Sequence, residues 1–164
     1  MQAEIITIGD ELLIGQVVDT NSAWLGRTLG EDGIKVTQIT SVQDDADQIA
    51  RAVNEALARV SIVLVTGGLG PTRDDITKHT LAELFGMRLV RDEQVYETVR
   101  RQLAVRGIAF NELNRGQALV PDGCTVLPNR NGTAPGMWFE RGRKILVSMP
   151  GVPFEMKALV TDEV

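Results

Sequence analysis

Residues 66–75, TGGLGPTRDD, combine three glycines with two adjacent carboxylates: Gly67, Gly68 and Gly70, then Asp74 and Asp75. The glycines allow the main chain to adopt positive φ angles and to approach a phosphate closely. A helix expected directly after Pro71 would direct its first N–H groups and its dipole toward the same anion. The two aspartates would repel a bare phosphate, but they would attract one that already carries Mg²⁺ or a similar hard cation. The stretch therefore predicts a metal–phosphate site, and a glycine-rich turn capped by one of the aspartates is the alternative.

A second pair of carboxylates, Asp10 and Glu11, follows the short apolar run at residues 4–9. Four carboxylates facing one glycine-rich turn suit metal-assisted hydrolysis of a phosphate ester or a pyrophosphate. In that chemistry the metal offsets the developing charge, and one carboxylate orients or deprotonates the attacking water. Taken singly, each acid is more commonly a helix N-cap or a solvated charge. The chemistry therefore depends on whether the fold brings the two pairs together.

A third polar segment, NRNGTAPGM at residues 129–137, carries side chains that could hydrogen-bond a ribose, a base or a pterin: Asn129, Asn131 and Thr133. A plain hairpin loop is an equally good interpretation of this segment. The single cysteine, Cys124, has no histidine near it in the sequence to activate it, so we expect it in the core.

The elements that must position these residues alternate between strand and helix patterns. Strands are expected at residues 4–9, 35–42, 61–66, 124–128, 136–140 and 144–150, and helices at 20–33, 45–60, 75–86, 92–106, 111–119 and 153–164. This order predicts an α/β protein with three α/β/α layers and a mostly parallel sheet. Such sheets bind ligands beyond the carboxyl ends of their strands, at a switch point in strand order. If the first and third strands are neighbours, the two glycine–acid turns share one crevice.

Composition restricts the class of protein. The length suits a single domain, residues 1–164. A net charge of −5 and an aromatic content of 4% argue against nucleic-acid or membrane-surface binding. The apolar runs are too short to span a bilayer, and the N-terminus lacks the basic leader of a signal peptide. With only one cysteine, a reducing, cytoplasmic setting is expected.

Four motifs together resemble one family: GDELLIGQVVDTN (9–21), TGGLGPTRDDITK (66–78), NGTAPG (131–136) and PGVPFEM (150–156). They are similar to the N-terminal domain of the competence/damage-inducible protein A family, CinA. That family lies within the molybdopterin-binding domain superfamily of MogA, MoaB and MoeA. The resemblance implies the MogA-like fold and a divalent-metal-dependent ADP-ribose pyrophosphatase, which would yield AMP and ribose 5-phosphate.

The resemblance also implies roles for individual residues. Catalysis would fall to Asp10, Glu11, Asp74 and Asp75, and the metal ligands would be Asp10, Asp74 and Asp75. Substrate and phosphate contacts would come from Asp19, Asn21, Gly67, Gly68, Gly70, Thr72, Thr77, Asn131, Gly132, Thr133, Pro135 and Gly136. The expected cofactor is Mg²⁺, Mn²⁺ or Co²⁺, with potassium as a further candidate. A small-molecule nucleotide substrate and a homo-oligomer, either dimer or trimer, are also implied, without nucleic acid or membrane as a partner.

Two other functions remain open at this point. The same crevice could serve a molybdopterin-binding or molybdopterin-transferring module, or the domain could be non-catalytic and associated with competence or DNA damage. CinA proteins commonly continue into a linking domain and a C-terminal nicotinamide mononucleotide deamidase domain, so the chain is expected to be part of a longer protein. The deamidase activity is not carried over to this chain.

Overall fold

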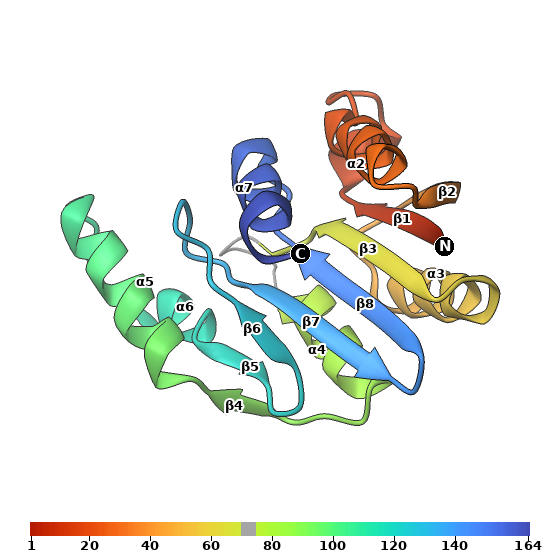
Figure 1. The fold of residues 1–164 in the computed structure, drawn as a ribbon. Helices are drawn as coiled ribbons and strands as arrows, with labels where there is room; N and C mark the ends of the chain where they lie inside the picture. Colours follow the sequence, from red (N-terminus) through yellow and green to blue (C-terminus); the bar gives the residue numbers. More distant parts are fainter. Residues whose placement is uncertain (70–74) are drawn as a thin grey trace.

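The fold is built on a six-stranded sheet, seen in a computed structural model that describes residues 1–69 and 75–164 (Figure 1). Its strands are β1 (Gln2–Ile8), β2 (Lys35–Val42), β3 (Ile62–Gly67), β6 (Thr125–Leu127), β7 (Gly136–Arg141) and β8 (Lys144–Met149). They lie in the order β2-β1-β3-β8-β7-β6. The first and third strands are therefore neighbours, which is the condition under which the two glycine–acid turns share one crevice.

Among the described strands of this sheet, β7 alone runs antiparallel to its neighbours, and the pairs β1–β2, β1–β3 and β3–β8 are parallel. Residues 142 and 143 alone connect β7 to β8, and so short a connection permits only antiparallel pairing. Gly142, with a φ of 62°, supplies the left-handed conformation that tight hairpin turns need. The prediction of a mostly parallel sheet is confirmed.

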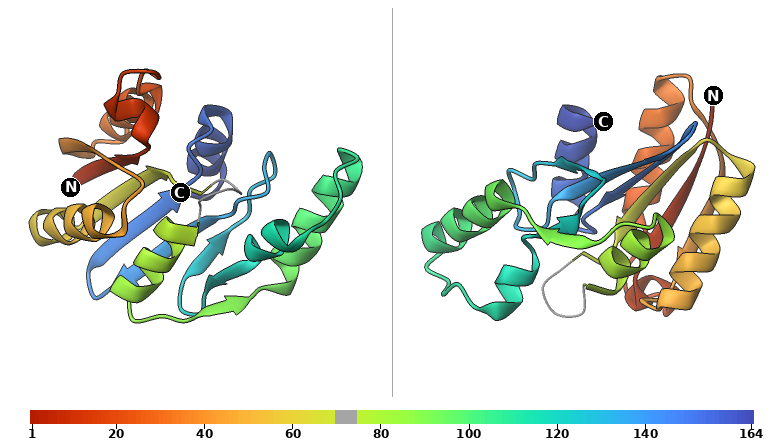
Figure 2. Two further views of the ribbon diagram at one scale, coloured as in Figure 1. Left: turned by 180° about the vertical axis from the view of Figure 1, so that it is seen from behind. Right: turned by 90° about the horizontal axis from the view of Figure 1, so that it is seen from below.

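Helices cover both faces of this sheet (Figures 1 and 2). The helices α2 (Thr20–Glu31) and α7 (Pro153–Glu163) lie on one face, and α3 (Ala46–Arg59) and α4 (Asp75–Leu84) lie on the other. Successive residues of a strand point to opposite faces, so Ile5 packs with α2 and α7 while Ile6 packs with α3 and α4. Because both faces of β1 are buried, its sequence is a continuous apolar run. The predicted three-layer α/β/α arrangement is confirmed.

Side-chain caps define where α2 and α3 begin. The carboxylate of Asp19 accepts a hydrogen bond from the Ser22 N–H at 3.0 Å, and that of Asp45 accepts one from the Gln48 N–H at 3.0 Å. Each bond satisfies an amide that has no partner inside the helix. Asp45 is therefore the N-cap of α3.

Several short elements were not predicted. They are the helix α1 (Asp10–Leu13) and a separate antiparallel sheet of β4 (Leu89–Arg91) and β5 (Leu119–Pro121). Strands of three residues are too short to show a period of two. The helix predicted at 111–119 is also wrong in length, because α6 (Glu112–Gly116) ends before β5 begins.

The helix α5 (Glu93–Val105) lies beyond the β6 edge of the main sheet and has a small core of its own (Figure 1). Val95, Val99 and Leu103, which are spaced to lie on one face of a helix, pack against Ala118 and Val120. No helix among residues 1–69 and 75–164 is long and apolar enough to cross a membrane.

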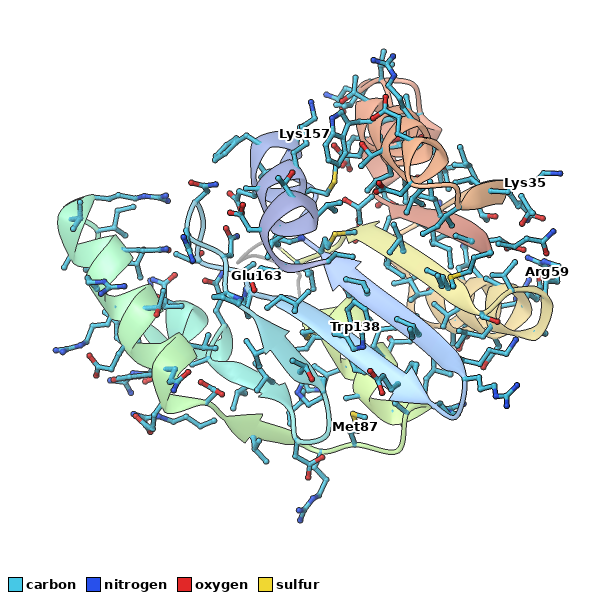
Figure 3. The ribbon with its side chains drawn as sticks, in the orientation of Figure 1. Lys35, Arg59, Met87, Trp138, Lys157 and Glu163 are labelled. Atoms are coloured by element: carbon cyan, nitrogen blue, oxygen red, sulfur yellow. The ribbon has the colours of Figure 1, made fainter. Side chains whose placement is uncertain are left out.

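A buried carboxylate forms an ion pair at the end of the main sheet where β1 begins. Glu4 in β1 is 2% exposed, and Arg59 at the end of α3 donates to both of its oxygens at 2.8 Å. Figure 3 shows Arg59 at this edge and Trp138 on the sheet face that carries α7. β1 and β3 end on the opposite side of the sheet, where the polar turns that follow them lie.

Candidate functional site

A cleft of about 480 Å³ lies at the carboxyl ends of β1 and β3. The chain leaves β1 for α2 on one face and returns to β3 from α3 on the other, so the cleft lies at a switch point in strand order. Glu11 and Leu12 of the first motif border it together with Gly67 and Gly68 of the second. The two glycine–acid turns therefore share one crevice, as the sequence predicted.

The charged side chains in the described lining of this cleft are all acidic. Glu11, Asp19 and Asp44 border it, and the described part of the lining contains no lysine or arginine. Asp10 is exposed and does not line the cleft, but its Oδ1 accepts a hydrogen bond from the backbone N–H of Asp44 at 3.3 Å. Asp44 escaped the sequence analysis, although its place just after β2 is the same signal that singled out Asp10.

The two glycines of the β3 turn are required by packing inside the protein. Gly67 and Gly68 have φ angles of 104° and 66°, which side chains rarely adopt. A Cβ on Gly67 would overlap the carbonyl oxygen of Ile8, and one on Gly68 would overlap the hydroxyl of Thr77. Glycine is therefore needed here whether or not a ligand approaches, and the proposed phosphate cradle remains a prediction.

A polar network joins three walls of the cleft. The Asn21 amide nitrogen donates to the Thr66 hydroxyl at 3.1 Å and to the Gly151 carbonyl at 2.8 Å. Thr66 in turn donates to the Pro150 carbonyl at 3.0 Å. The network uses both N–H groups of Asn21, which fixes the orientation of its amide. Thr66 was not predicted as a site residue, and its place two residues before Gly68 was the available signal.

The NGTAPG segment lies at the same edge of the sheet but outside the cleft. Gly132, Thr133 and Pro135 border a second pocket, of about 160 Å³, between α5 and β6, and Asn131 is exposed. Gly136 begins β7, and a Cβ there would press on Leu127 and Leu159. Of the three predicted substrate-binding motifs, the structure therefore brings together the first two.

Part of the predicted metal site lies outside the described residues. Gly70, Thr72 and Asp74 are not described, and Asp75 is described only as the first residue of α4. Thr77 is 1% exposed, and its hydroxyl has no hydrogen-bond partner among residues 1–69 and 75–164. In the described part of the chain, no three His, Cys, Asp or Glu side chains cluster closely enough to hold a metal ion.

The described acids nevertheless fit one kind of metal. Mg²⁺ keeps several waters and is commonly held by one or two carboxylates together with substrate phosphates, so it needs no closed cage of protein ligands. Glu11, Asp19 and Asp44 border one cleft, and one or two of their carboxylates would be enough for such a partial set of oxygen ligands. A soft-metal site is not supported, because Cys124 belongs to the cores around α5 and α3 rather than to the cleft.

The chain is similar to proteins of one family over its whole length. A family model described as "Probable molybdopterin binding domain" matches residues 4–164. CinA-like proteins of Cytophaga hutchinsonii and Flavobacterium psychrophilum are 51% and 45% identical to the chain over 160 and 165 residues. The alignments cover 98% and 100% of this chain but 38% and 40% of those proteins. The chain thus spans less than half the length of the curated relatives that it matches.

Solved structures agree with this grouping. The protein CinA from Thermoplasma acidophilum superposes with a TM-score of 0.89 at 37% identity, covering 98% of this chain and 94% of that one. The molybdopterin biosynthesis enzyme MoaB from Thermus thermophilus has a TM-score of 0.65 at 20% identity, covering 97% and 86%, which shows a shared fold alone. With the four motifs, the fold and the shared cleft, these similarities show that the chain belongs to the CinA proteins, within the molybdopterin-binding domain family.

Proposed function

We propose that this domain is a divalent-metal-dependent hydrolase of nucleoside diphosphate sugars, with ADP-ribose as the first substrate to test and AMP and ribose 5-phosphate as products. One observation carries the proposal: a glycine turn and three carboxylates meet in a single cleft at the β1–β3 switch point. Bare acids in a phosphate site are unfavourable unless a cation accompanies the phosphate, so the combination favours a metal-bound pyrophosphate.

In this proposal Glu11, rather than Asp10, orients the attacking water or accepts its proton, because of these two predicted catalytic acids Glu11 alone lines the cleft. The divalent ion, when bound, would offset the negative charge that develops on the phosphate oxygens. Asp19 and Asn21, at the start of α2, line the cleft and are the predicted substrate contacts of this segment.

A second candidate function is the binding or transfer of molybdopterin. The match to the molybdopterin-binding family model and the MoaB-like fold favour it. The cleft volume of about 480 Å³ suits a ligand of either kind, since small-molecule sites are commonly about 300–1,000 Å³. A non-catalytic role for the domain would leave both ligands unbound.

One assay separates these candidates. The purified chain is incubated with ADP-ribose and Mg²⁺, Mn²⁺ or Co²⁺, with and without potassium, and AMP is measured. Retention of molybdopterin is measured in parallel. AMP formation that Glu11→Gln abolishes supports the hydrolase. Glu31→Gln is the matched control, because Glu31 is an exposed acid that lies outside the cleft. Molybdopterin retention without AMP would overturn the hydrolase in favour of the second candidate.

The cellular part of the proposal is a cytoplasmic homo-oligomer, either dimer or trimer, acting on a small-molecule nucleotide. Light scattering after size-exclusion chromatography gives the mass directly, and the monomer mass of 17.9 kDa is the result that would contradict self-association.

A further inference from the structure

The side chain of Asn129 organises the loop that carries the NGTAPG motif. Asn129 is 5% exposed, and its amide nitrogen donates to the carbonyl of Ala134 at 2.9 Å and to Glu155 Oε2 at 2.7 Å. Its amide oxygen accepts from the N–H groups of Asn131 and Gly132, each at 3.0 Å. Both N–H groups and both lone pairs of the amide are then engaged. Asn129 has no free group for a ribose, a base or a pterin, contrary to one interpretation of the sequence.

Glu155 explains why residue 132 is glycine. A Cβ on Gly132 would overlap the carboxylate of Glu155. The φ angle of Gly132 lies outside the left-handed region, so its backbone would accept alanine without strain. A side chain at position 132 would therefore displace this carboxylate of α7 from its hydrogen bond with Asn129.

The helix α7 connects this loop to the cleft. Val152 and Pro153, at the start of α7, border the cleft, and Glu155 follows two residues later. Gly151, just before them, accepts the hydrogen bond from Asn21. Figure 1 shows the loop between β6 and β7 rising beside α7. Residues 151–153 thus border the cleft, while Glu155, in the same segment, accepts a hydrogen bond from Asn129 in the NGTAPG loop.

We propose that Glu155 and Asn129 are positioning residues, which hold the NGTAPG loop in register with the cleft and do not themselves contact the substrate. In this proposal Gly132 leaves space for the Glu155 carboxylate and does not bind a ligand. The kinetic consequence rests on the proposed pyrophosphatase function, whereas the structural consequence does not.

The structural consequence is tested by combining two substitutions and measuring Tm without ligand. Gly132→Ala alone should lower Tm by about 2–4 °C or more, because the new methyl group displaces the carboxylate. In the Glu155→Ala background the same change should have no further effect, since the obstructing group is gone. Gly30→Ala is the control, because a Cβ there meets no other atom. An equal loss in both backgrounds would overturn the proposal.

Hydrogen exchange supplies a second measurement for the case in which Glu155→Ala is poorly stable. In Glu155→Ala the Asn129 amide loses its anchor on α7, so the N–H groups of Asn131 and Gly132 should exchange about tenfold faster. Glu155→Gln keeps an oxygen that can accept from Asn129, and it should retain the slow exchange. If the N–H groups of Asn131 and Gly132 exchange at the parent rate in both variants, the proposed anchoring of the loop by Glu155 is wrong.

Kinetics then test the positioning role. Glu155→Ala should lower kcat/KM for ADP-ribose by about ten- to a hundredfold, because residues 151–153, which border the cleft, lose the anchor that Glu155 gives them on the NGTAPG loop. Glu155→Gln should retain most of the activity. If Glu155→Gln loses as much as Glu155→Ala, the carboxylate acts chemically and the positioning role is wrong. If the parent chain produces no AMP, the pyrophosphatase is rejected, and the Gly132–Glu155 pair of substitutions still decides the structural proposal.

Discussion

At the scale of single residues, the acids and glycines that suggested chemistry separate into two kinds. Glu11 and Asp44 border the cleft, and Asp19 both borders it and caps α2, so one carboxylate can serve structure and site together. At Gly67 and Gly68, neighbouring atoms of the protein leave no space for a side chain. A glycine-rich pattern alone therefore does not distinguish a ligand cradle from a tightly packed turn.

Gly68→Ala should destabilise the protein in the absence of any ligand. The residue has a φ of 66°, and its Cβ would overlap the Thr77 hydroxyl, so the free energy of unfolding should fall by about 1 kcal/mol or more. Chemical denaturation measures this change. Gly26→Ala, in the middle of α2 where a Cβ meets nothing, should instead be neutral or stabilising. Equal effects of the two substitutions would remove the packing argument.

Cys124 should react slowly with alkylating reagents. Burial raises the pKa of its thiol to about 11, above an ordinary value near 9. At pH 8.5 the native protein should therefore react with iodoacetamide about a hundredfold more slowly than the denatured chain. As pH rises from about 9 to 11 the unfolded state loses the thiol proton first, so the thiol's contribution to stability falls across that window. Equal alkylation rates in native and denatured protein would contradict this prediction.

At the scale of elements, the long helices were predicted because their start signals and apolar faces depend on local spacing. Ile49 and Val53 mark the buried face of α3, and Asp45 caps it. The short strands β4 and β5 were missed, because each has three residues and is stabilised by pairing with a partner about 30 residues away. Tertiary pairing thus decided the elements that local pattern could not.

Asp45→Ala should weaken α3 by removing its cap. The loss of the bond to the Gln48 amide should lower the free energy of unfolding by about 0.5–2 kcal/mol. Asp45→Asn can still accept that bond and should stay close to the parent. Asp47→Ala, in the same exposed first turn but without a capping bond, is the matched control. Denaturant titration of the three variants provides the measurement.

At the scale of the whole molecule, the order β2-β1-β3 brings together turns that lie more than 50 residues apart in the chain. Two consecutive crossovers on opposite faces of the sheet leave the carboxyl ends of β1 and β3 uncovered between them. The cleft is a consequence of this topology, and the acids at the strand ends become one site only through it.

Ligand binding should therefore protect both turns at once. With ADP-ribose and Mg²⁺ present, amide exchange should slow in residues 9–19 and in residues 66–69, because both segments border the same cleft. The sheet of β4 and β5, which does not line the cleft, should exchange at an unchanged rate. Protection of only one of the two turns would show that the ligand does not bridge them.

The sequence by itself determined the α/β class, the strand ends that border the candidate site, and the family. Buried strands, helix starts and contiguous motifs can each be recognised from residues that are close together in the chain. It could not decide that the Asn129 amide is fully hydrogen-bonded by its own loop and Glu155, that the Glu155 carboxylate lies against Gly132, or that Asp44 borders the cleft. Those facts depend on contacts between residues distant in the chain. Only the packing of α7 against the β6–β7 loop, and of β2 beside β1, brings these residues within reach of one another.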